Sequence, residues 1–187
     1  MTHDETMALL SPQGPVISIM RDEEREYLWN ICQNLPLGCV VEVGASHGGT
    51  TLLLHQATNR PIHVVENWIS RRREDFLANA EKYNTKYIEY PEGSPAAAKN
   101  FAPNTCALIL IDGEHENNAP KIDLLTWINK VKTGGYLLVD DVACGLPKVT
   151  KAVLEMHREL TLYELDWCHE YDDNDLRGIK LVSYKRN

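Results

Sequence analysis

The fold of this chain is decided by residues 40–51, Val40-Val41-Glu42-Val43-Gly44-Ala45-Ser46-His47-Gly48-Gly49-Thr50-Thr51. A β-branched apolar run ends at Gly44, and a segment with helical character begins after Gly48. This order predicts a strand, a tight turn and a helix N-terminus, where backbone N–H groups and the helix dipole can face a ligand. Glycine suits positions at which a Cβ would obstruct the backbone or a close ligand. The stretch predicts a ligand-binding βα turn, although such turns also occur without a ligand.

The spacing of the glycines distinguishes two kinds of cofactor. A dinucleotide fingerprint needs glycines at the first, third and sixth positions of the turn, and Ser46 occupies the third, where the backbone must approach a pyrophosphate. Glu42, two residues before the first glycine, is badly placed for a diphosphate and well placed for a cationic ligand. The pattern Glu42-x-Gly44-x-x-x-Gly48 resembles the first motif of Rossmann-like S-adenosylmethionine methyltransferases, whose turn holds the amino-acid end of the cofactor. This resemblance implies a cofactor role for Glu42, Gly44, Ala45, Ser46 and Gly48.

On either side of the turn, strand and helix patterns alternate. Strands are expected at 39–43, 62–66, 86–90, 107–111, 136–139, 161–166 and 178–184. Helices are expected at 22–35, 50–57, from 70 onward, at 120–132 and at 146–159, and a short one is expected after the N-cap Ser94. Asp22 is expected to cap the first, and Gly134-Gly135 to end the helix at 120–132. The inward side chains are expected to be Phe76, Leu77 and Ala80 in the helix from 70 onward, and Leu124, Leu125, Ile128 and Val131 in the helix at 120–132.

This alternation predicts an α/β fold. It is a Rossmann-like, doubly wound and mostly parallel seven-stranded sheet, with one antiparallel strand near the C-terminus and helices on both faces. Residues 1–20 lack a clean periodicity and are expected to form an N-terminal arm or lid, and 21–187 a single catalytic domain.

Ligands of such sheets bind beyond the carboxyl ends of the strands, and polar residues gather there. Glu66 lies about twenty residues after the turn, where a carboxylate can accept hydrogen bonds from a ribose, or simply be solvated. Asn67 and Trp68 follow it, and Trp68 is expected either to cover an adenine or to anchor its loop. Ser94 has a sufficient role as a helix cap and is also a candidate for the adenine side.

Three carboxylates follow the two strands expected at 107–111 and 136–139. Asp112 ends the first, and Asp140 and Asp141 end the second. Adjacent strands lie about 4.8 Å apart, so these side chains can converge on one cation, and oxygen ligands suit Mg²⁺, Ca²⁺ or Mn²⁺. The alternative is a loop cap and two solvated acids. His115, three residues after Asp112, is a candidate general base near neutral pH, or otherwise a surface histidine.

The segments Ile111-Asp112-Gly113-Glu114-His115, Lys132-Thr133-Gly134-Gly135 and Val139-Asp140-Asp141 resemble the macrocin-type O-methyltransferases. The resemblance extends from about Asp22 to the C-terminus. It implies that Asp112, Asp140 and Asp141 bind a divalent metal, most simply Mg²⁺, and that His115 is the base. Asp112 is also assigned to the cofactor and to catalysis. The chain is shorter than this family, which leaves the acceptor size and the oligomeric state open.

These features lead to one hypothesis: methyl transfer from S-adenosylmethionine to a hydroxyl of a small molecule, assisted by a metal. The alternatives are a metal-independent N- or O-methyltransferase, a noncatalytic cofactor-binding or assembly protein on the same fold, and a nicotinamide oxidoreductase. The net charge of -8 argues against a nucleic-acid or membrane partner, and a homo-oligomer remains open. Without a basic leader or a long apolar run, a cytoplasmic location is expected. The five dispersed cysteines, with no CxxC pair, argue against a disulfide scaffold or a zinc site.

Overall fold

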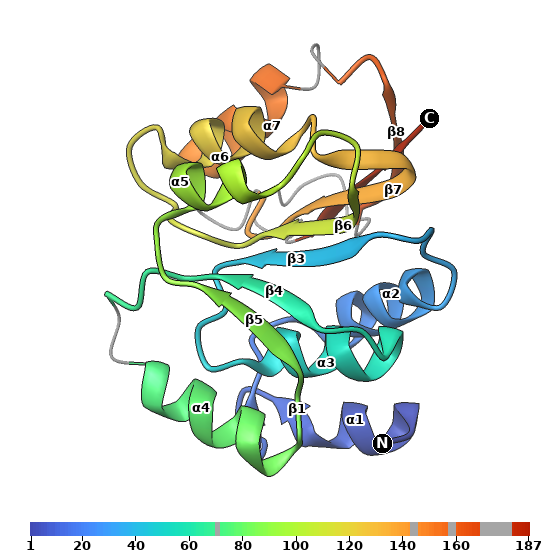
Figure 1. Cartoon of the computed structure of the whole chain (residues 1–187), viewed down its shortest axis with the longest axis vertical. Coiled ribbons are helices and arrows are strands. Elements are labelled where there is room, and N and C mark those ends of the chain that lie inside the picture. Colours follow the sequence, from blue (N-terminus) through green and yellow to red (C-terminus); the bar gives the residue numbers. More distant parts are fainter. Residues whose placement is uncertain (70–71, 143–145, 157–159, 169–180) are drawn as a thin grey trace, which may run out of the picture.

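The chain folds around a mixed β-sheet with helices on both faces, as a computed structural model describes for residues 1–69, 72–142, 146–156, 160–168 and 181–187 (Figure 1). Within these residues seven strands form the main sheet, in the order β5-β4-β3-β6-β7-β9-β8. The strands from β3 to β7 run parallel, and β9 is antiparallel to both β7 and β8. The predicted fold class is therefore confirmed, including its single antiparallel strand.

The strands of the main sheet are β3 (Cys39–Val43), β4 (Ile62–Val65), β5 (Tyr87–Tyr90), β6 (Cys106–Ile111), β7 (Val131–Val139), β8 (Tyr163–Cys168) and β9 (Val182–Arg186). The helices are α1 (His3–Leu9), α2 (Asp22–Cys32), α3 (Gly49–Thr58), α4 (Arg73–Lys82), α5 (Ser94–Ala97), the 3₁₀ helix η1 (Ala98–Asn100), α6 (Ala119–Trp127) and α7 (Pro147–Met156). A separate pair of short parallel strands, β1 (Leu10–Ser11) and β2 (Val16–Ile17), belongs to the N-terminal segment.

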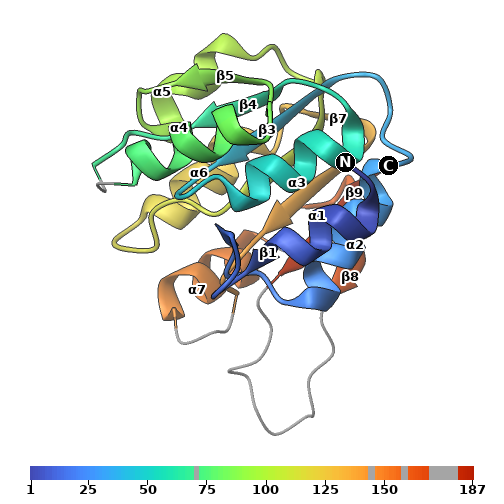
Figure 2. The same cartoon turned by 90° about the horizontal axis from the view of Figure 1, so that it is seen from below.

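The helices divide between the two faces of the sheet. Figures 1 and 2 show α1 to α4 on one face and α5 to α7 on the other. Each side has its own apolar core, one built around Leu53 and Phe76 and the other around Ile109 and Trp127. Because parallel strands are covered on both faces, β6 reads as a continuous apolar run, and all six of its residues are buried. The strong strand signal in the sequence thus reports a central position.

The N-terminal segment contains a helix, α1, where only an irregular arm was expected. Thr2 caps α1 by accepting from the backbone N–H of Glu5 at 3.2 Å, and the Glu5 carboxylate accepts from the backbone N–H of Thr2 at 2.8 Å. This reciprocal pair is a capping box, which the sequence Thr-x-x-Glu could have revealed. Leu10 and Val16 then join the core beside α3. Whether the segment opens and closes as a lid stays a prediction.

The predicted boundary between α6 and β7 was wrong. The helix was expected to continue to residue 132, whereas it ends at Trp127 and the strand already begins at Val131. Val131 pairs with Cys106 of β6, so the sheet takes residues that a helical pattern also suited. Gly135 lies inside the strand, where a Cβ would come within 2.7 Å of the Ala107 carbonyl oxygen. Gly135 therefore permits a close approach of two strands, and the two glycines do not end a helix.

Smaller corrections concern caps and faces. Arg21, not Asp22, is the N-cap of α2, and Gly93, not Ser94, is the N-cap of α5. Leu77 and Leu125, expected to face inward, are 37% and 45% exposed, whereas the residues before them, Phe76 and Leu124, are buried. Other bounds also differ from the prediction: α2 ends at Cys32, α4 begins at Arg73, α7 ends at Met156, and β8 and β9 begin at Tyr163 and Val182. Of the predicted helix and strand residues, 70–71, 157–159 and 178–180 lie outside the described residues.

None of the helices in the described parts of the chain is both long enough and apolar enough to cross a bilayer.

Candidate active site

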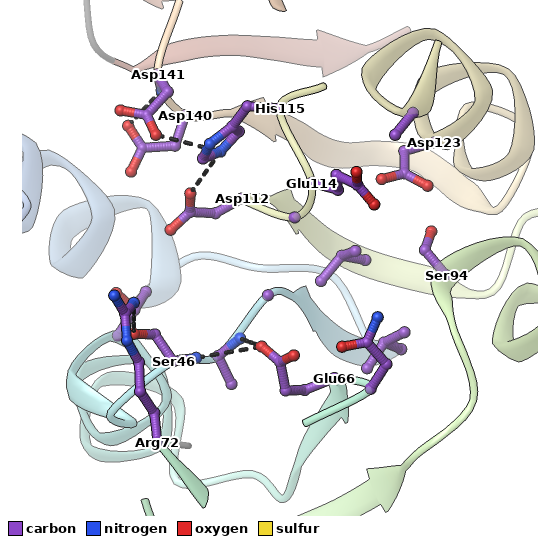
Figure 3. A pocket seen from close by; sticks show the side chains of 18 of the residues that line it. Ser46, Glu66, Arg72, Ser94, Asp112, Glu114, His115, Asp123, Asp140 and Asp141 are labelled. Atoms are coloured by element: carbon purple, nitrogen blue, oxygen red, sulfur yellow. Dashed lines mark hydrogen bonds and ion pairs between the residues drawn. The ribbon is translucent and has the colours of Figure 1, made fainter. Parts of the chain in front are cut away.

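A cavity of about 770 Å³ opens at the carboxyl ends of the parallel strands. Its lining comes from the turn after β3, the segments after β4, β6 and β7, the beginning of α5, one side of α6 and the N-terminal stretch Ile17 to Met20. Figure 3 shows the acidic side chains that project into it. This cavity thus lies at the edge of the sheet where the sequence predicted a site.

The turn after β3 requires glycine at its first position. Gly44 has φ of +89°, and a Cβ there would lie 1.8 Å from the carbonyl oxygen of Asp112. Gly44 donates its N–H to Val65 at 3.0 Å, and Asp112 donates to Val43 at 2.8 Å, so the sheet hydrogen bonding continues past the strand ends. Only a residue without a side chain can bring the turn this close to the end of β6.

The predicted turn residues do not all face the cavity. Gly44, Ala45 and Ser46 line it. Gly48 is not part of the lining, since a Cβ there would lie 2.8 Å from the Phe76 ring, against which the turn packs. Its φ of +84° makes it the left-handed N-cap of α3.

Glu66 holds the turn from the neighbouring strand. Its carboxylate accepts hydrogen bonds from the backbone N–H groups of Ala45 at 3.1 Å and Ser46 at 3.4 Å, and from that of Trp68 at 3.2 Å (Figure 3). A carboxylate offers about four acceptor sites, so these three bonds leave room for a further donor from a ligand. Glu66 and Asn67 both line the cavity.

Trp68 takes a position that matches loop anchoring. Its ring lies 5.0 Å from that of Phe76, and its indole N–H donates to Glu89 at 2.6 Å. Trp68 is not part of the cavity lining, whereas Ile69 next to it is.

Glu42 lies beneath the turn and not in the cavity. It is 1% exposed, and its carboxylate accepts a hydrogen bond of 2.5 Å from the Thr51 hydroxyl. Burial, aided by the charges of Asp112 and Glu66, raises the pKa of Glu42 to about 8, although the hydrogen bond from Thr51 opposes this rise. A neutral Glu42 is thus favoured in the folded protein up to mildly alkaline pH.

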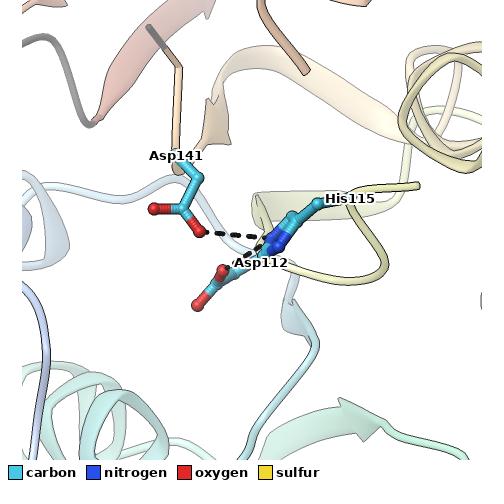
Figure 4. A group of neighbouring side chains, drawn as sticks. All are labelled: Asp112, His115 and Asp141. Carbon is cyan, nitrogen blue, oxygen red and sulfur yellow. Dashed lines mark ion pairs between the residues drawn. The ribbon is translucent and has the colours of Figure 1, made fainter. Parts of the chain in front are cut away.

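The structure brings Asp112, His115 and Asp141 together above β6 and β7 (Figure 4). The Nε2 atom of His115 lies 3.6 Å from Asp112 Oδ1 and 3.2 Å from Asp141 Oδ2. Interaction with Asp112 and the charge of Asp141 raise the pKa of His115, and partial burial opposes them. Among the described residues, these three form the group whose potential ligand atoms all lie within 4.8 Å of one another.

Asp140, the third predicted metal ligand, lies outside that group. It is 4% exposed and lines the cavity, and its carboxylate accepts from the backbone N–H of Asp141 at 2.8 Å. Asp141 adopts φ of +61°, so the chain bends after Asp140 and turns the Asp141 side chain toward His115. The metal role of Asp140 stays a prediction.

The donor set fits a divalent cation chemically. Two carboxylates and an imidazole are ordinary ligands of Mn²⁺, Fe²⁺ or Zn²⁺, and with added water they also suit Mg²⁺. The Nε2 atom of His115 is buried and lies within ion-pair distance of both carboxylates, a position that suits a bound cation or a shared proton.

The far end of the cavity contains a polar cluster of Ser94, which was a predicted site residue, and Asp123, which was not. Ser94 lines the cavity, and its hydroxyl accepts from the indole N–H of Trp127 at 2.8 Å. Asp123 of α6 also lines it, and burial raises the pKa of Asp123 to about 6. Asp123 was not predicted, because only the apolar side chains of the helix expected at 120–132 were assigned a direction. A carboxylate one position before the inward Leu124 was the available signal.

Arg72 was also missed, because it was assigned to a helix interior. It lines the cavity, and its guanidinium donates to the Ser46 hydroxyl at 2.8 Å (Figure 3). It supplies a cation beside the glycine turn, opposite the acidic group of Asp112 and Asp141.

A sequence model described as "Methyltransferase domain" matches residues 41–142, which is just over half of the chain and runs from the third residue of β3 to beyond the end of β7. No curated protein matches the chain.

Solved structures with the same fold cover nearly the whole chain. A Streptococcus mutans protein in complex with SAH (S-adenosylhomocysteine) has a TM-score of 0.69 at 14% identity, over 91% of this chain and 100% of that one. An rRNA methylase from Streptococcus thermophilus has a TM-score of 0.68 at 12% identity, over 91% and 99%. The O-methyltransferase NovP has a TM-score of 0.64 at 21% identity, over 90% and 81%.

Proposed function

This chain belongs to the methyltransferase-domain family, and on that basis we propose that it transfers a methyl group from S-adenosylmethionine to a hydroxyl group of a small molecule. The observation that carries the proposal is the single cavity surface that joins the glycine turn to Asp112, His115 and Asp141. A donor held by the turn would have its reactive end beside a group able to accept a proton. The SAH complex with the same fold also supports this choice of cofactor.

The cofactor would lie along the carboxyl ends of β3, β4 and β6. Its amino-acid end would meet the turn at Gly44 and Ser46, with Arg72 near its carboxylate. Its ribose would meet Glu66, and its base the end of the cavity at Ser94 and Asp123. The cavity volume of about 770 Å³ leaves space for a second small molecule, because ligand pockets typically measure about 300 to 1,000 Å³.

His115 is the group in this cavity best suited to take the proton of the acceptor hydroxyl. Its Nε2 atom points at the two carboxylates, which would stabilise the imidazolium formed by proton transfer. Holding the hydroxyl and the methyl group in line within the cavity would supply much of the rate.

A divalent metal, if bound, would be held by Asp112 and Asp141, with Asp140 or His115 completing the set. Such a cation would lower the pKa of the acceptor hydroxyl and fix its orientation. The metal-independent alternative has a specific observation in its favour, since His115 is already paired with both carboxylates. With a metal, His115 would be either a ligand or the base beside it; without a metal, His115 would be a base supported by two acids.

A small and not strongly anionic acceptor fits the lining better than a nucleic acid. Six carboxylates line the cavity, at Glu66, Asp112, Glu114, Asp123, Asp140 and Asp141. They would repel a phosphate backbone, which is usually bound by lysine and arginine. The exposed isoleucines Ile17 and Ile19 line the same cavity on the N-terminal side and would contact an apolar part of the acceptor.

Calorimetry with SAH, with and without Mg²⁺, tests cofactor and metal together. We expect SAH to bind the wild type, and we expect Mg²⁺ to tighten binding or raise the melting temperature, with this gain lost in Asp112→Asn. Glu116→Gln is the matched control, because Glu116 belongs to the same loop, is exposed and pairs with Lys148 outside the cavity lining. It should retain the full response to Mg²⁺.

The outcomes separate the alternatives. SAH binding with no response to Mg²⁺ in any variant would favour metal-independent transfer. Tighter binding of NAD than of SAH would refute the cofactor assignment. If the protein binds SAH and transfers methyl groups to amines, but not to a panel of phenols, sugars and other alcohols, the acceptor atom would be nitrogen and not oxygen.

A further inference from the structure

Two cysteine side chains meet at the amino ends of the central strands, opposite the edge that carries the cavity. Cys39 is the first residue of β3 and Cys106 the first residue of β6, and the two are direct partners in the sheet. Their Sγ atoms lie 3.3 Å apart. Because paired residues of adjacent parallel strands project from the same face, both thiols point toward the core on the side of α5 to α7.

The contact depends on an irregularity in the strand pairing. Cys39 pairs with Cys106, but the next pair is Val40 with Leu108, so the register skips Ala107. Such an extra residue bends one strand and re-aims its side chains. Gly38, just before Cys39, allows the close approach, since a Cβ there would come within 2.5 Å of the Thr105 carbonyl oxygen.

The two thiols differ in access and in acidity. Cys39 is partly exposed, whereas Cys106 is fully buried. The neighbouring Cys106 thiol lowers the pKa of Cys39 by donating to its thiolate, and this effect outweighs the burial of Cys39. The same contact raises the pKa of Cys106, and burial adds to the rise. Cys39 is therefore the nucleophile of the pair, and Cys106 is the reserve thiol next to it.

We propose that Cys39 and Cys106 form a peroxide-reactive thiol pair that closes to a reversible disulfide. The Cys39 thiolate attacks one oxygen of hydrogen peroxide, the O–O bond breaks, and with one proton taken up a sulfenic acid and water result. The Cys106 sulfur then attacks the Cys39 sulfur, an S–S bond forms, and the second oxygen leaves as water with the proton of Cys106. Two thiols are oxidised by two electrons, and one peroxide is reduced to two waters.

The geometry permits this closure with a small movement. A disulfide needs an S–S distance of about 2.05 Å and Cα atoms about 4.4 to 6.8 Å apart, a range that includes the spacing of neighbouring strands. The sulfurs therefore have to approach by roughly 1.2 Å, which side-chain rotation and the irregular pairing at Ala107 can supply. The reaction needs no residue of the cavity.

Mass spectrometry of the full-length protein tests the proposal. Reduced protein is treated with one equivalent of hydrogen peroxide, alkylated and digested without reductant. We expect a peptide pair that joins Cys39 to Cys106, two hydrogens lighter than the sum of its free peptides and separated again by dithiothreitol. In Cys106→Ser the sulfenic acid at Cys39 has no partner, so dimedone should label Cys39.

Cys32→Ser is the matched control, because Cys32 is a buried thiol of α2 whose pKa burial raises to about 12. It should leave the linked peptide unchanged, whereas Cys39→Ser should slow the oxidation of Cys106 at least about tenfold, as expected when the accessible thiolate is lost. Recovery of Cys39 and Cys106 as free thiols while other cysteines are oxidised would overturn the proposal. So would dimedone labelling of wild-type Cys39 without any linked peptide.

Discussion

Glu42 gives the sharpest quantitative prediction, because its carboxyl group is buried beneath the cofactor turn. It is 1% exposed, its hydrogen bond comes from the neutral Thr51, and its pKa is raised from 4.5 to about 8, mainly by burial. The folded protein therefore keeps a proton on Glu42 over a pH range in which the unfolded chain has already lost it.

The sign and the size of the effect follow from this difference. Where the folded state binds one proton more than the unfolded state, the free energy of unfolding falls by about 1.4 kcal/mol for each pH unit. This stabilising contribution of Glu42 is complete below pH 4.5 and is lost as the pH rises toward about 8. Between pH 5 and pH 7 the loss amounts to about 2 to 3 kcal/mol.

Glu42→Gln removes the titration while it keeps the shape of the side chain. Urea unfolding at pH 5, 6, 7 and 8 would give the free energy of unfolding of both proteins. We expect the free energy of unfolding of the variant, relative to that of the wild type, to rise by about 2 to 3 kcal/mol between pH 5 and pH 7. A destabilisation by the buried amide that does not depend on pH would leave this rise unchanged.

The control is Glu23→Gln, an equal change of charge at an exposed position of α2. Its curve should run parallel to that of the wild type. A constant difference between Glu42→Gln and the wild type from pH 5 to pH 8 would refute the reasoning, because it would mean that Glu42 gains no proton on folding.

Two further stability predictions follow from the same region. Gly44→Ala should lower the free energy of unfolding, measured in urea, by more than about 3 kcal/mol, because a Cβ would lie 1.8 Å from the carbonyl oxygen of Asp112 in a left-handed backbone. Gly93→Ala is the control, because a Cβ at Gly93 would have no atom within 4 Å, and it should change the free energy of unfolding by no more than about 0.5 kcal/mol. Ser94→Ala should lower the free energy of unfolding by about 1 to 3 kcal/mol, because it leaves the indole N–H of the buried Trp127 without its acceptor. Ser94→Thr keeps a hydroxyl and should recover part of this loss. Equal stability of the two Ser94 variants would contradict this.

The central strands of the parallel part could be predicted because they are buried on both faces, whereas the edge strand β5 is only partly buried. Burial leaves an uninterrupted apolar run in β6, and β3, β4 and β6 are followed by Gly44, Glu66 and Asp112. The bounds of β3 could be read directly, as could those of β4 and β5 to within a residue. The signal comes from each strand itself, so it survives without knowledge of its neighbours.

Elements whose bounds depend on a partner could not be predicted in the same way. Val131 has a place both in a helical stripe and in a strand, and its pairing with Cys106 decides between them. The meeting of Cys39 with Cys106 also depends on a shift of register, which nothing in either segment indicates alone. Only α1 was missed despite a local signal, the capping box of Thr2 and Glu5.

Sheet register explains why the candidate site could be anticipated in outline. Just beyond the strand ends, Asp112 donates its backbone N–H to the carbonyl of Val43 in β3, and Asp140 donates its backbone N–H to the carbonyl of Ile111 in β6. Each acidic segment is therefore placed by a hydrogen bond to the neighbouring strand of the sheet. A slip of one residue would move every side chain to the opposite face. The positions of Asp112 and Asp140 follow from this ladder, which is set by the apolar strands.

The side chain that completes the group obeys no such rule. Asp141 reaches His115 only because the chain turns to φ of +61° at that residue, and His115 itself stands on a loop. The sequence predicted that all of these residues lie at one end of the cavity and that Asp140 is a third metal ligand. The structure groups His115 with Asp112 and Asp141, and the metal role of Asp140 stays a prediction. The sheet ladder thus determines where the acidic segments begin, and the two loops determine that the His115 imidazole lies beside Asp112 and Asp141.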